Sequence, residues 1–272
     1  GGTPQSNYRA SFGVMDHNTI IKNMDYGVFV AKMDVTQKAF NDRLTGDFGV
    51  FGSSFKNHDI FDTQMLFYSA ACQNPTFPAG TDENGNWLKN ESAAKINPPG
   101  IVLAEKNDSK DLNFDAHVKL SYDFNPNWRI STFGSYLYGS TENAQFCPTW
   151  VWAQGNVYRG EFKKEEWLGN VSVDFNKEFG IHKISAGASG EYRKLKKTAF
   201  WVYAKGIPTN DFNYDNLGAT AARPYGGTES TYEDQSLASV MGSVTYTLLD
   251  RYTLSANARG DGSSMVGDNN TW

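Results

Sequence analysis

The sequence predicts an all-β protein: part of an antiparallel β-barrel that spans a membrane, with about nine strands of a larger barrel. Three observations predict it. Apolar and polar residues alternate over long segments, tight turns alternate with long connections, and aromatic residues flank the tight turns. The composition agrees, because 14% aromatic residues, 26 glycines and only 9 prolines suit strands and turns better than a helical bundle.

The clearest strand runs from Leu112 to Phe124. Its even-numbered positions carry apolar side chains and its odd-numbered positions carry polar or charged ones. Such a strand presents one face to an apolar phase and the other to water. It is longer than the ~5 or 6 residues of a usual soluble strand, and it suits a membrane strand, which needs about 9 to 11. We expect the even-numbered residues to face lipid and the odd-numbered ones the lumen.

Eight further segments repeat this alternation. The regular ones are Lys183–Arg193, Ala238–Leu248 and Arg251–Arg259, and the weaker ones are Tyr8–Val14, Phe29–Val35, Leu44–Gly52, Trp128–Tyr138 and Gly169–Phe175. No apolar run approaches the ~18 to 20 residues of a membrane-spanning helix. The sequence therefore predicts nine strands.

The connections between these strands alternate in length. Tight turns fall at Lys38–Asn41, Asn125-Pro126, Asn176–Gly180 and Leu249-Asp250. The other connections are a modest one at His17–Asp25 and long loops at Ile60–Lys110, Ser140–Phe162 and Lys196–Tyr232. This layout is typical of outer-membrane barrels, which have short periplasmic turns and long extracellular loops. Phe124, Trp128, Phe175, Phe179, Tyr246 and Tyr252 flank the turns, as an aromatic girdle at the membrane interface would.

Several function classes find no support. A net charge of −5 argues against nucleic-acid binding. The four histidines are scattered, and no metal-ligand or catalytic motif occurs in a suitable context. Asp82, Asn84 and Asn86 are spaced like the start of a calcium loop, but Trp87 stands where its glycine belongs. We expect no enzymatic activity, metal or cofactor. Cys72 and Cys147 allow one disulfide or two free thiols.

Three motifs extend over nearly the whole chain. The first contains Gly1-Gly2, Asn7-Tyr8, Ala10-Ser11 and Ile20-Ile21-Lys22-Asn23. The second is Gln73–Pro78 with Asp82–Gly85, and the third is Tyr252–Ala256, Arg259–Ser264 and Asn269–Trp272. In this order the motifs resemble the barrel of SusC-like (SusC/RagA) TonB-dependent outer-membrane transporters. The chain departs from the family pattern at Asn257, Gly260, Met265 and Val266.

The resemblance implies a nutrient importer in the outer membrane of a Gram-negative cell. Residues 1–272 would be part of its barrel domain, without the plug domain and the C-terminal strands. The implied partners are a SusD-like surface lipoprotein, outer-membrane lipid and the TonB complex, which would act through the N-terminal part that is missing here. The implied substrate is a glycan or a peptide, and the sequence does not determine which.

Aromatic residues in two of the predicted loops are the candidate site residues. Trp150, Trp152 and Tyr158 fall in one loop, and Trp201, Tyr203 and Tyr225 fall in another. Exposed aromatic rings suit sugar stacking or a flat protein interface. We therefore expect these residues to bind substrate or to dock the lipoprotein lid. The alternative is that they pack the loops against each other.

The sequence leaves two other function classes open. One is an outer-membrane β protein that does not transport actively, such as a porin or an adhesin. The other is a soluble β-sandwich that binds glycans.

Overall fold

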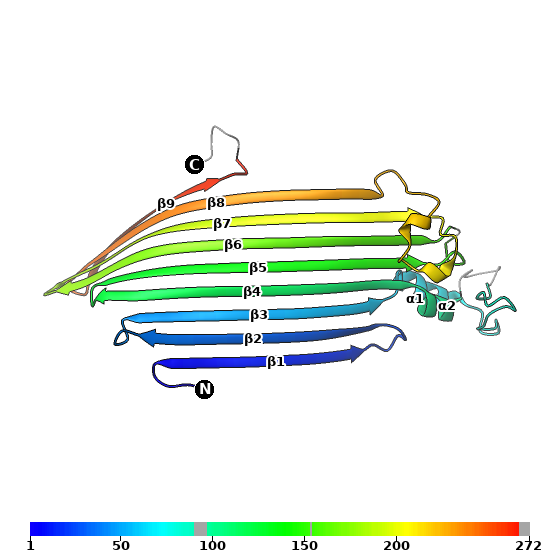
Figure 1. The fold of residues 1–272 in the computed structure, drawn as a ribbon, viewed down its shortest axis with the longest axis horizontal. Helices are drawn as coiled ribbons and strands as arrows, with labels where there is room; N and C mark the ends of the chain where they lie inside the picture. Colours follow the sequence, from blue (N-terminus) through cyan, green and yellow to red (C-terminus); the bar gives the residue numbers. More distant parts are fainter. Residues whose placement is uncertain (90–96, 153, 267–272) are drawn as a thin grey trace.

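The computed structural model describes residues 1–89, 97–152 and 154–266, so the motif segment Asn269–Trp272 lies outside the described residues. Its nine antiparallel strands form one sheet in chain order, each strand hydrogen-bonded to its sequence neighbours (Figure 1). This confirms the predicted fold class and the number of strands. The sandwich alternative is wrong, because it needs two packed sheets.

The strands are long. They are β1 (Ser6–Asn18), β2 (Asp25–Ala39), β3 (Leu44–Asp59), β4 (Lys106–Asn125), β5 (Trp128–Cys147), β6 (Asn156–Phe179), β7 (His182–Lys205), β8 (Thr228–Leu248) and β9 (Tyr252–Ser263). The connections contain the helices α1 (Thr63–Cys72) and α2 (Pro98–Ala104) and the 3₁₀ turns η1 (Asn210–Phe212) and η2 (Leu217–Ala219).

The tight turns gather at one end of the sheet, which we call the turn end (Figure 1). Leu249 and Asp250 both adopt positive φ, the conformation that matches the twist of an antiparallel hairpin. Phe40, Asn41 and Asp42 do the same between β2 and β3. The opposite end, the loop end, carries the connections 19–24, 60–105, 148–155 and 206–227. The predicted alternation of turns and loops is confirmed.

Two of the predicted loop ranges are wrong. The loop Ser140–Phe162 shrinks to residues 148–155, and the loop Lys196–Tyr232 shrinks to residues 206–227. The strands β5 to β8 continue past the predicted boundaries because their backbone ladders do. The β5 extension is mostly polar on both faces, whereas residues 199–204 of β7 are apolar on both faces. In both cases the alternation stops although the strand does not. The third loop, predicted at Ile60–Lys110, contains α1 and α2 and ends at Glu105.

The cross-strand register assigns each residue to a face, because directly paired residues point the same way. The outward face carries the even-numbered residues of β4 and most of the large apolar side chains that are exposed. Representatives from seven strands are Phe12, Phe29, Val50, Phe114, Trp167, Val171, Val240 and Leu254. A broad apolar surface of this kind is what lipid covers in a membrane barrel.

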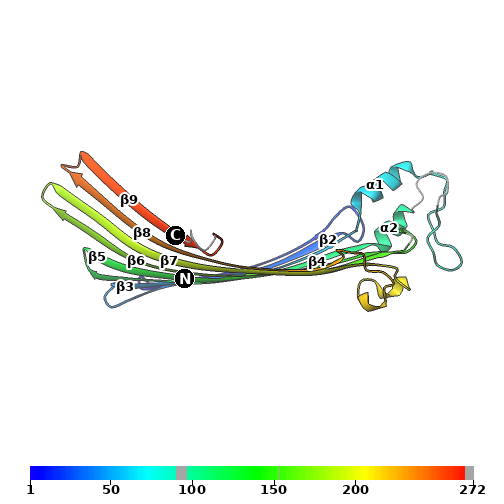
Figure 2. The ribbon, with the colours of Figure 1, turned by 90° about the horizontal axis from the view of Figure 1, so that it is seen from above.

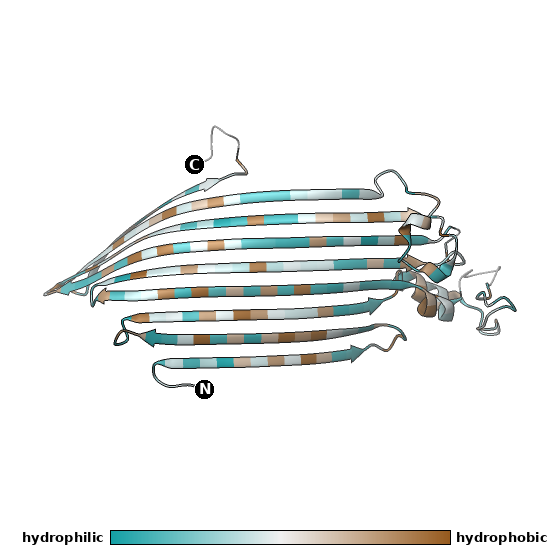
Figure 3. Ribbon diagram, viewed as in Figure 1, coloured by the Kyte–Doolittle hydropathy of each residue, from teal (hydrophilic) through white to brown (hydrophobic). Residues whose placement is uncertain are grey.

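The opposite face, the lumen face, is mostly polar. It carries ion pairs such as Lys32–Asp34 at 3.1 Å, Glu166–Arg193 at 2.7 Å and Arg259–Asp261 at 2.8 Å. Hydrophobic and hydrophilic residues alternate along the strands (Figure 3). The sheet curves toward the side that carries α1 and α2 (Figure 2). The sheet is therefore part of a barrel wall, apolar outside and polar inside.

The apolar belt on the outward face has the height of a membrane. On β5 it runs from Trp128 to Tyr138, which at ~3.3 Å per residue is about 33 Å of strand. A strand tilt of about 40° reduces this to about 25 Å, the usual height of the lipid-facing band. Predicted girdle residues border it at the turn end, where the Trp128 and Phe175 rings lie 4.6 Å apart and the His182 and Tyr246 side chains are hydrogen-bonded.

The helices belong to the loop end only. None in the described part of the chain is long and apolar enough to cross a membrane. Cys72 ends α1 and Cys147 ends β5, and both thiols are free, so the disulfide that the sequence allowed is not formed.

Val118 and Lys119 test the assignment of the faces. Val118 lies near the middle of the belt, so we expect Val118→Arg to lower the free energy of unfolding in bilayers by about 2 to 4 kcal/mol. Lys119→Arg, one residue along on the lumen face, should change it by less than about 0.5 kcal/mol. The measurement is reversible urea unfolding of the full-length protein in lipid vesicles. Equal access of a water-soluble quencher to spin labels at the two positions would contradict the assignment.

Candidate functional site

The structure separates the six predicted site residues into three groups. Trp150 and Trp152 lie in the β5–β6 loop, and Tyr225, which is fully exposed, lies in the β7–β8 loop. Tyr158 lies on β6, and Trp201 and Tyr203 lie on β7. These last three residues were predicted on loops, and that placement is wrong because both strands extend beyond the membrane belt.

Tyr158, Trp201 and Tyr203 form a cluster that we call the lumen aromatic patch. Tyr158 is paired directly with Tyr203, and Gly160 with Trp201, so all three rings are on the lumen face near the loop end. The Tyr158 ring folds over Gly160, where an added Cβ would lie only 2.5 Å from the Tyr158 hydroxyl. The Tyr203 hydroxyl donates to Asn156 Oδ1 at 3.1 Å. The two neighbouring strands thus hold the rings on a rigid wall.

Trp150 packs against the β3–β4 loop. Its ring centroid lies 6.4 Å from that of Trp87. Both indoles lie on Gly100 of α2, where a Cβ would meet each of them at 2.7 Å. This contact favours the loop-packing interpretation for Trp150. Trp152 lies two residues further along and is 41% exposed.

Glu105 anchors the β3–β4 loop to the barrel wall on the lumen side. The Cys147 thiol donates to Glu105 Oε1 at 3.3 Å, and the Asp62 backbone N–H donates to Glu105 Oε2 at 3.2 Å. Asp62 also caps α1, accepting from the Met65 N–H at 2.8 Å. Burial raises the pKa of the Glu105 carboxyl to about 7, while the bonds from Cys147 and Asp62 oppose that rise. Burial and the Glu105 carboxylate likewise raise the pKa of the Cys147 thiol.

The β7–β8 loop packs on the outward face, on the opposite side of the sheet from α1 and α2 (Figure 2). Ile207 of this loop joins a buried cluster with Phe146, Val157 and Ala204, and the loop residues Tyr214 and Leu217 pack against it. Phe146, Val157 and Ala204 are paired in register on the outward face. The two long loops therefore cover opposite faces of the same wall.

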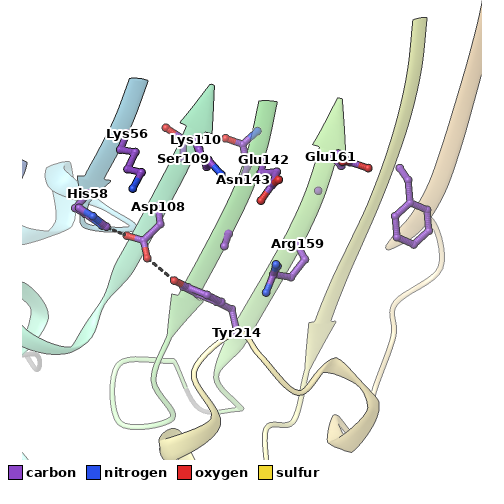
Figure 4. A pocket seen from close by; sticks show the side chains of 13 residues that line it. Lys56, His58, Asp108, Ser109, Lys110, Glu142, Asn143, Arg159, Glu161 and Tyr214 are labelled. Carbon is purple, nitrogen blue, oxygen red and sulfur yellow. Dashed lines mark hydrogen bonds and ion pairs between the residues drawn. The ribbon is translucent and has the colours of Figure 1, made fainter. Parts of the chain in front are cut away.

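Tyr214 is one of the residues that line a hollow of about 480 Å³, which we call the outward pocket; Figure 4 shows the lining side chains. The Tyr214 hydroxyl donates to Asp108 Oδ2 at 2.5 Å, and His58 Nδ1 lies 3.0 Å from Asp108 Oδ1. Arg159 pairs with Asp215 at 3.1 Å, and its guanidinium lies 5.4 Å from the Tyr214 ring. Burial, together with the Asp108 carboxylate, raises the pKa of Tyr214 to about 12.

The charged lining of the outward pocket was missed at the sequence level. Its side chains are Lys56, His58, Asp108, Lys110, Glu142, Arg159 and Glu161, with Phe200 and Tyr214. A signal was present, since Lys110 continues the even-numbered face of Leu112–Phe124 beyond the point where that face stops being apolar. Among the residues that the structure describes, no three His, Cys, Asp or Glu side chains are close enough to hold a metal ion.

Comparison with known proteins places the chain among membrane receptors. No protein-family model matches it. Residues of this chain align with TonB-dependent receptor P3 of Formosa agariphila at 27% identity over 197 residues, 70% of this chain and 19% of the relative. TonB-dependent receptor SusC of Bacteroides thetaiotaomicron aligns at 25% identity over 309 positions and covers the whole chain.

This chain is similar to a segment of SusC-like TonB-dependent receptors. It spans 19% to 29% of the length of the curated relatives that it matches. The fold agrees with solved structures. The RagAB peptide transporter superposes with a TM-score of 0.76 at 13% identity, over all of this chain and 32% of that one. The open form of the ferric-catecholate receptor Fiu of E. coli gives a TM-score of 0.56 at 9% identity, over 96% of this chain and 40% of that one.

The same similarities indicate where the chain lies in the cell. TonB-dependent receptors of this kind are β-barrels in the outer membrane of Gram-negative bacteria, so the apolar belt of the SusC-like segment lies in that membrane. By the rule for such barrels, the turn end is periplasmic and the loop end is extracellular.

The anchor at Glu105 predicts a pH dependence. A carboxyl whose pKa is raised on folding, here from 4.5 to about 7, stabilises the fold fully below the lower value and loses that contribution as pH rises through the higher one. We expect the α1 backbone amides to exchange hydrogen faster at about pH 8 than at about pH 5, after correction for intrinsic rates. Glu105→Gln keeps an acceptor without a charge, so it should remove the dependence. Identical wild-type protection at both pH values would contradict this prediction.

Proposed function

We propose that this SusC-like segment forms part of the wall and the extracellular mouth of an outer-membrane nutrient importer. The observation that supports the proposal most is the alignment of the whole chain with SusC. The geometry is consistent with it, because a curved wall that is apolar outside and polar inside encloses a path for a polar solute. In the complete protein, uptake would draw its energy from the TonB complex through parts that lie outside this segment.

We further propose that the lumen aromatic patch contacts the substrate as it enters. Tyr158, Trp201 and Tyr203 are held on neighbouring strands, on the lumen face and above the membrane belt. Rings that present flat apolar faces and polar edges suit the faces and hydroxyls of sugars, so a glycan is the substrate we favour. A peptide is the second candidate, because the structurally similar RagAB is described as a peptide transporter.

A SusD-like surface lipoprotein is the proposed partner at the loop end. Trp152 and Tyr225 are exposed there, as are Phe67 and Tyr68 on α1, at 58% and 63%. Large apolar side chains left exposed on ordered loops are typical of protein interfaces. They support docking of a lid at the loop end.

The substrate role predicts an uptake defect without an assembly defect. Replacing Tyr158, Trp201 and Tyr203 together by Ala in the full-length receptor should weaken uptake at low substrate concentration by at least about tenfold, since each stacking contact contributes on the order of 1 kcal/mol. The measurement is growth and radiolabelled uptake on the cognate nutrient. Phe200→Ala is the matched control, because Phe200 precedes Trp201 on the same strand but faces outward.

Three results are informative here. Unchanged uptake by the triple variant would leave the three rings with a packing role only. Equal loss in the Phe200→Ala control would point to a general defect of the wall. Uptake that persists without TonB would favour the porin alternative over active import.

The docking role predicts a separate phenotype. Trp152→Ala combined with Tyr225→Ala should reduce co-purification of the surface lipoprotein, because both side chains are exposed at the loop end. The same variant should assemble normally and keep the heat-modifiable electrophoretic mobility of a folded barrel. Trp150→Ala serves as a comparison. Trp150 packs on Trp87 and Gly100, so its loss should disturb the packing of the β3–β4 loop rather than remove a docking contact. Full retention of the lipoprotein by the double variant would reject these two residues as docking contacts.

A further inference from the structure

We propose that the outward pocket binds the phosphorylated headgroup of a glycolipid in the outer leaflet of the membrane. The proposal concerns the outside of the barrel wall and does not depend on the transport proposal. It rests on three observations: two lysines that are paired across neighbouring strands, the height of the pocket above the apolar belt, and the polar side chains around Tyr214 that line the rest of the pocket.

The lysines are the first observation. Lys56 of β3 and Lys110 of β4 are directly paired across the two strands, so their ammonium-bearing side chains leave the sheet on the same face. Like charges in this arrangement destabilise a sheet. On its other side Lys110 is directly paired with Glu142 of β5, but within the described residues neither lysine is close enough to a carboxylate to form an ion pair. A phosphate placed between them would remove the repulsion and accept a charge-assisted hydrogen bond from each.

The level of the pocket is the second observation. Leu112 is the last apolar residue of β4 on the outward face, and Lys110 is the next residue on that face. Two residues of strand place Lys110 only about 7 Å beyond the belt. The headgroup layer of a bilayer is ~5 to 8 Å thick on each side of the hydrocarbon core. The lysines therefore lie at headgroup depth on the extracellular side.

The other polar side chains that line the pocket are the third observation. Tyr214 lines the pocket and is fixed by its bond to Asp108 (Figure 4). The neighbouring Arg159–Asp215 pair holds the same loop. On the β5 side of Lys110, Glu142 is paired directly with Lys110 across β4 and β5 and with Glu161 across β5 and β6. Their carboxylates repel an anion, so a phosphate is confined to the half of the pocket that holds Lys56 and Lys110. The hydroxyl, carboxylate and guanidinium groups around it suit the hydroxyls of a sugar.

Lys56→Gln combined with Lys110→Gln tests the proposal in the full-length receptor. The probe is lipid A, offered in detergent micelles in its phosphorylated and its dephosphorylated form and counted per barrel by native mass spectrometry. We expect the wild type to retain the phosphorylated form, and the double variant to bind it at least about tenfold more weakly. Lys119→Gln on the lumen face of β4 is the matched control and should bind like the wild type.

A second measurement guards against a folding artefact. Without lipid A, the double variant should melt close to the temperature of the wild type, because loss of the Lys56–Lys110 repulsion offsets loss of the Lys110–Glu142 attraction. Adding phosphorylated lipid A should raise the melting temperature of the wild type only.

Equal binding of phosphorylated lipid A to the wild type and the double variant would overturn the proposal. So would equal retention of the dephosphorylated form, which would show a site for sugar or acyl chains. Displacement by millimolar inorganic phosphate alone would indicate a site for free anions. Loss of a receptor dimer in the double variant, with unchanged lipid binding, would assign the pocket to a second copy of the chain.

Discussion

The structure depends on one constraint: a backbone inside a membrane must satisfy its own hydrogen bonds, because lipid offers no partners. Nine antiparallel strands in chain order meet this constraint with an unbroken ladder from β1 to β9. The ladder fixes the register, and the register sorts side chains to two faces. A shift by one residue would turn Val118 and its neighbours into the lumen and Lys119 into lipid. The alternation of apolar and polar residues in the sequence therefore reflects the register of the strands.

Above the membrane the same ladder has a different use. β6 and β7 continue well past the belt, where water is present on both faces and apolar alternation is no longer required. The extended wall carries the lumen aromatic patch on one face and the outward pocket on the other. Because neighbouring residues of a strand point to opposite faces, Phe200 and Trp201 belong to different sites although they are adjacent in sequence.

The long loops divide between these faces. The β3–β4 loop is held on the lumen side by the buried Glu105, which links the end of β5 to the cap of α1. The β7–β8 loop is held on the outward side by apolar packing around Ile207 and by the bond from Tyr214 to Asp108. One loop thus lies on the lumen side of the wall, while the other covers the outward face beside the outward pocket.

By itself the sequence determined the strand count, the tight turns and the lipid face of the segment Leu112–Phe124, because these follow from local periodicity and turn chemistry. It did not determine where strands ended beyond the membrane. Residues 140–147 are mostly polar and residues 199–204 are apolar on both faces, so neither segment alternates although both backbones stay paired. Nor did it assign Tyr158, Trp201 and Tyr203 to one patch, or bring Lys56 opposite Lys110. Those neighbours are far apart in the chain, and only the register of the folded sheet places them together.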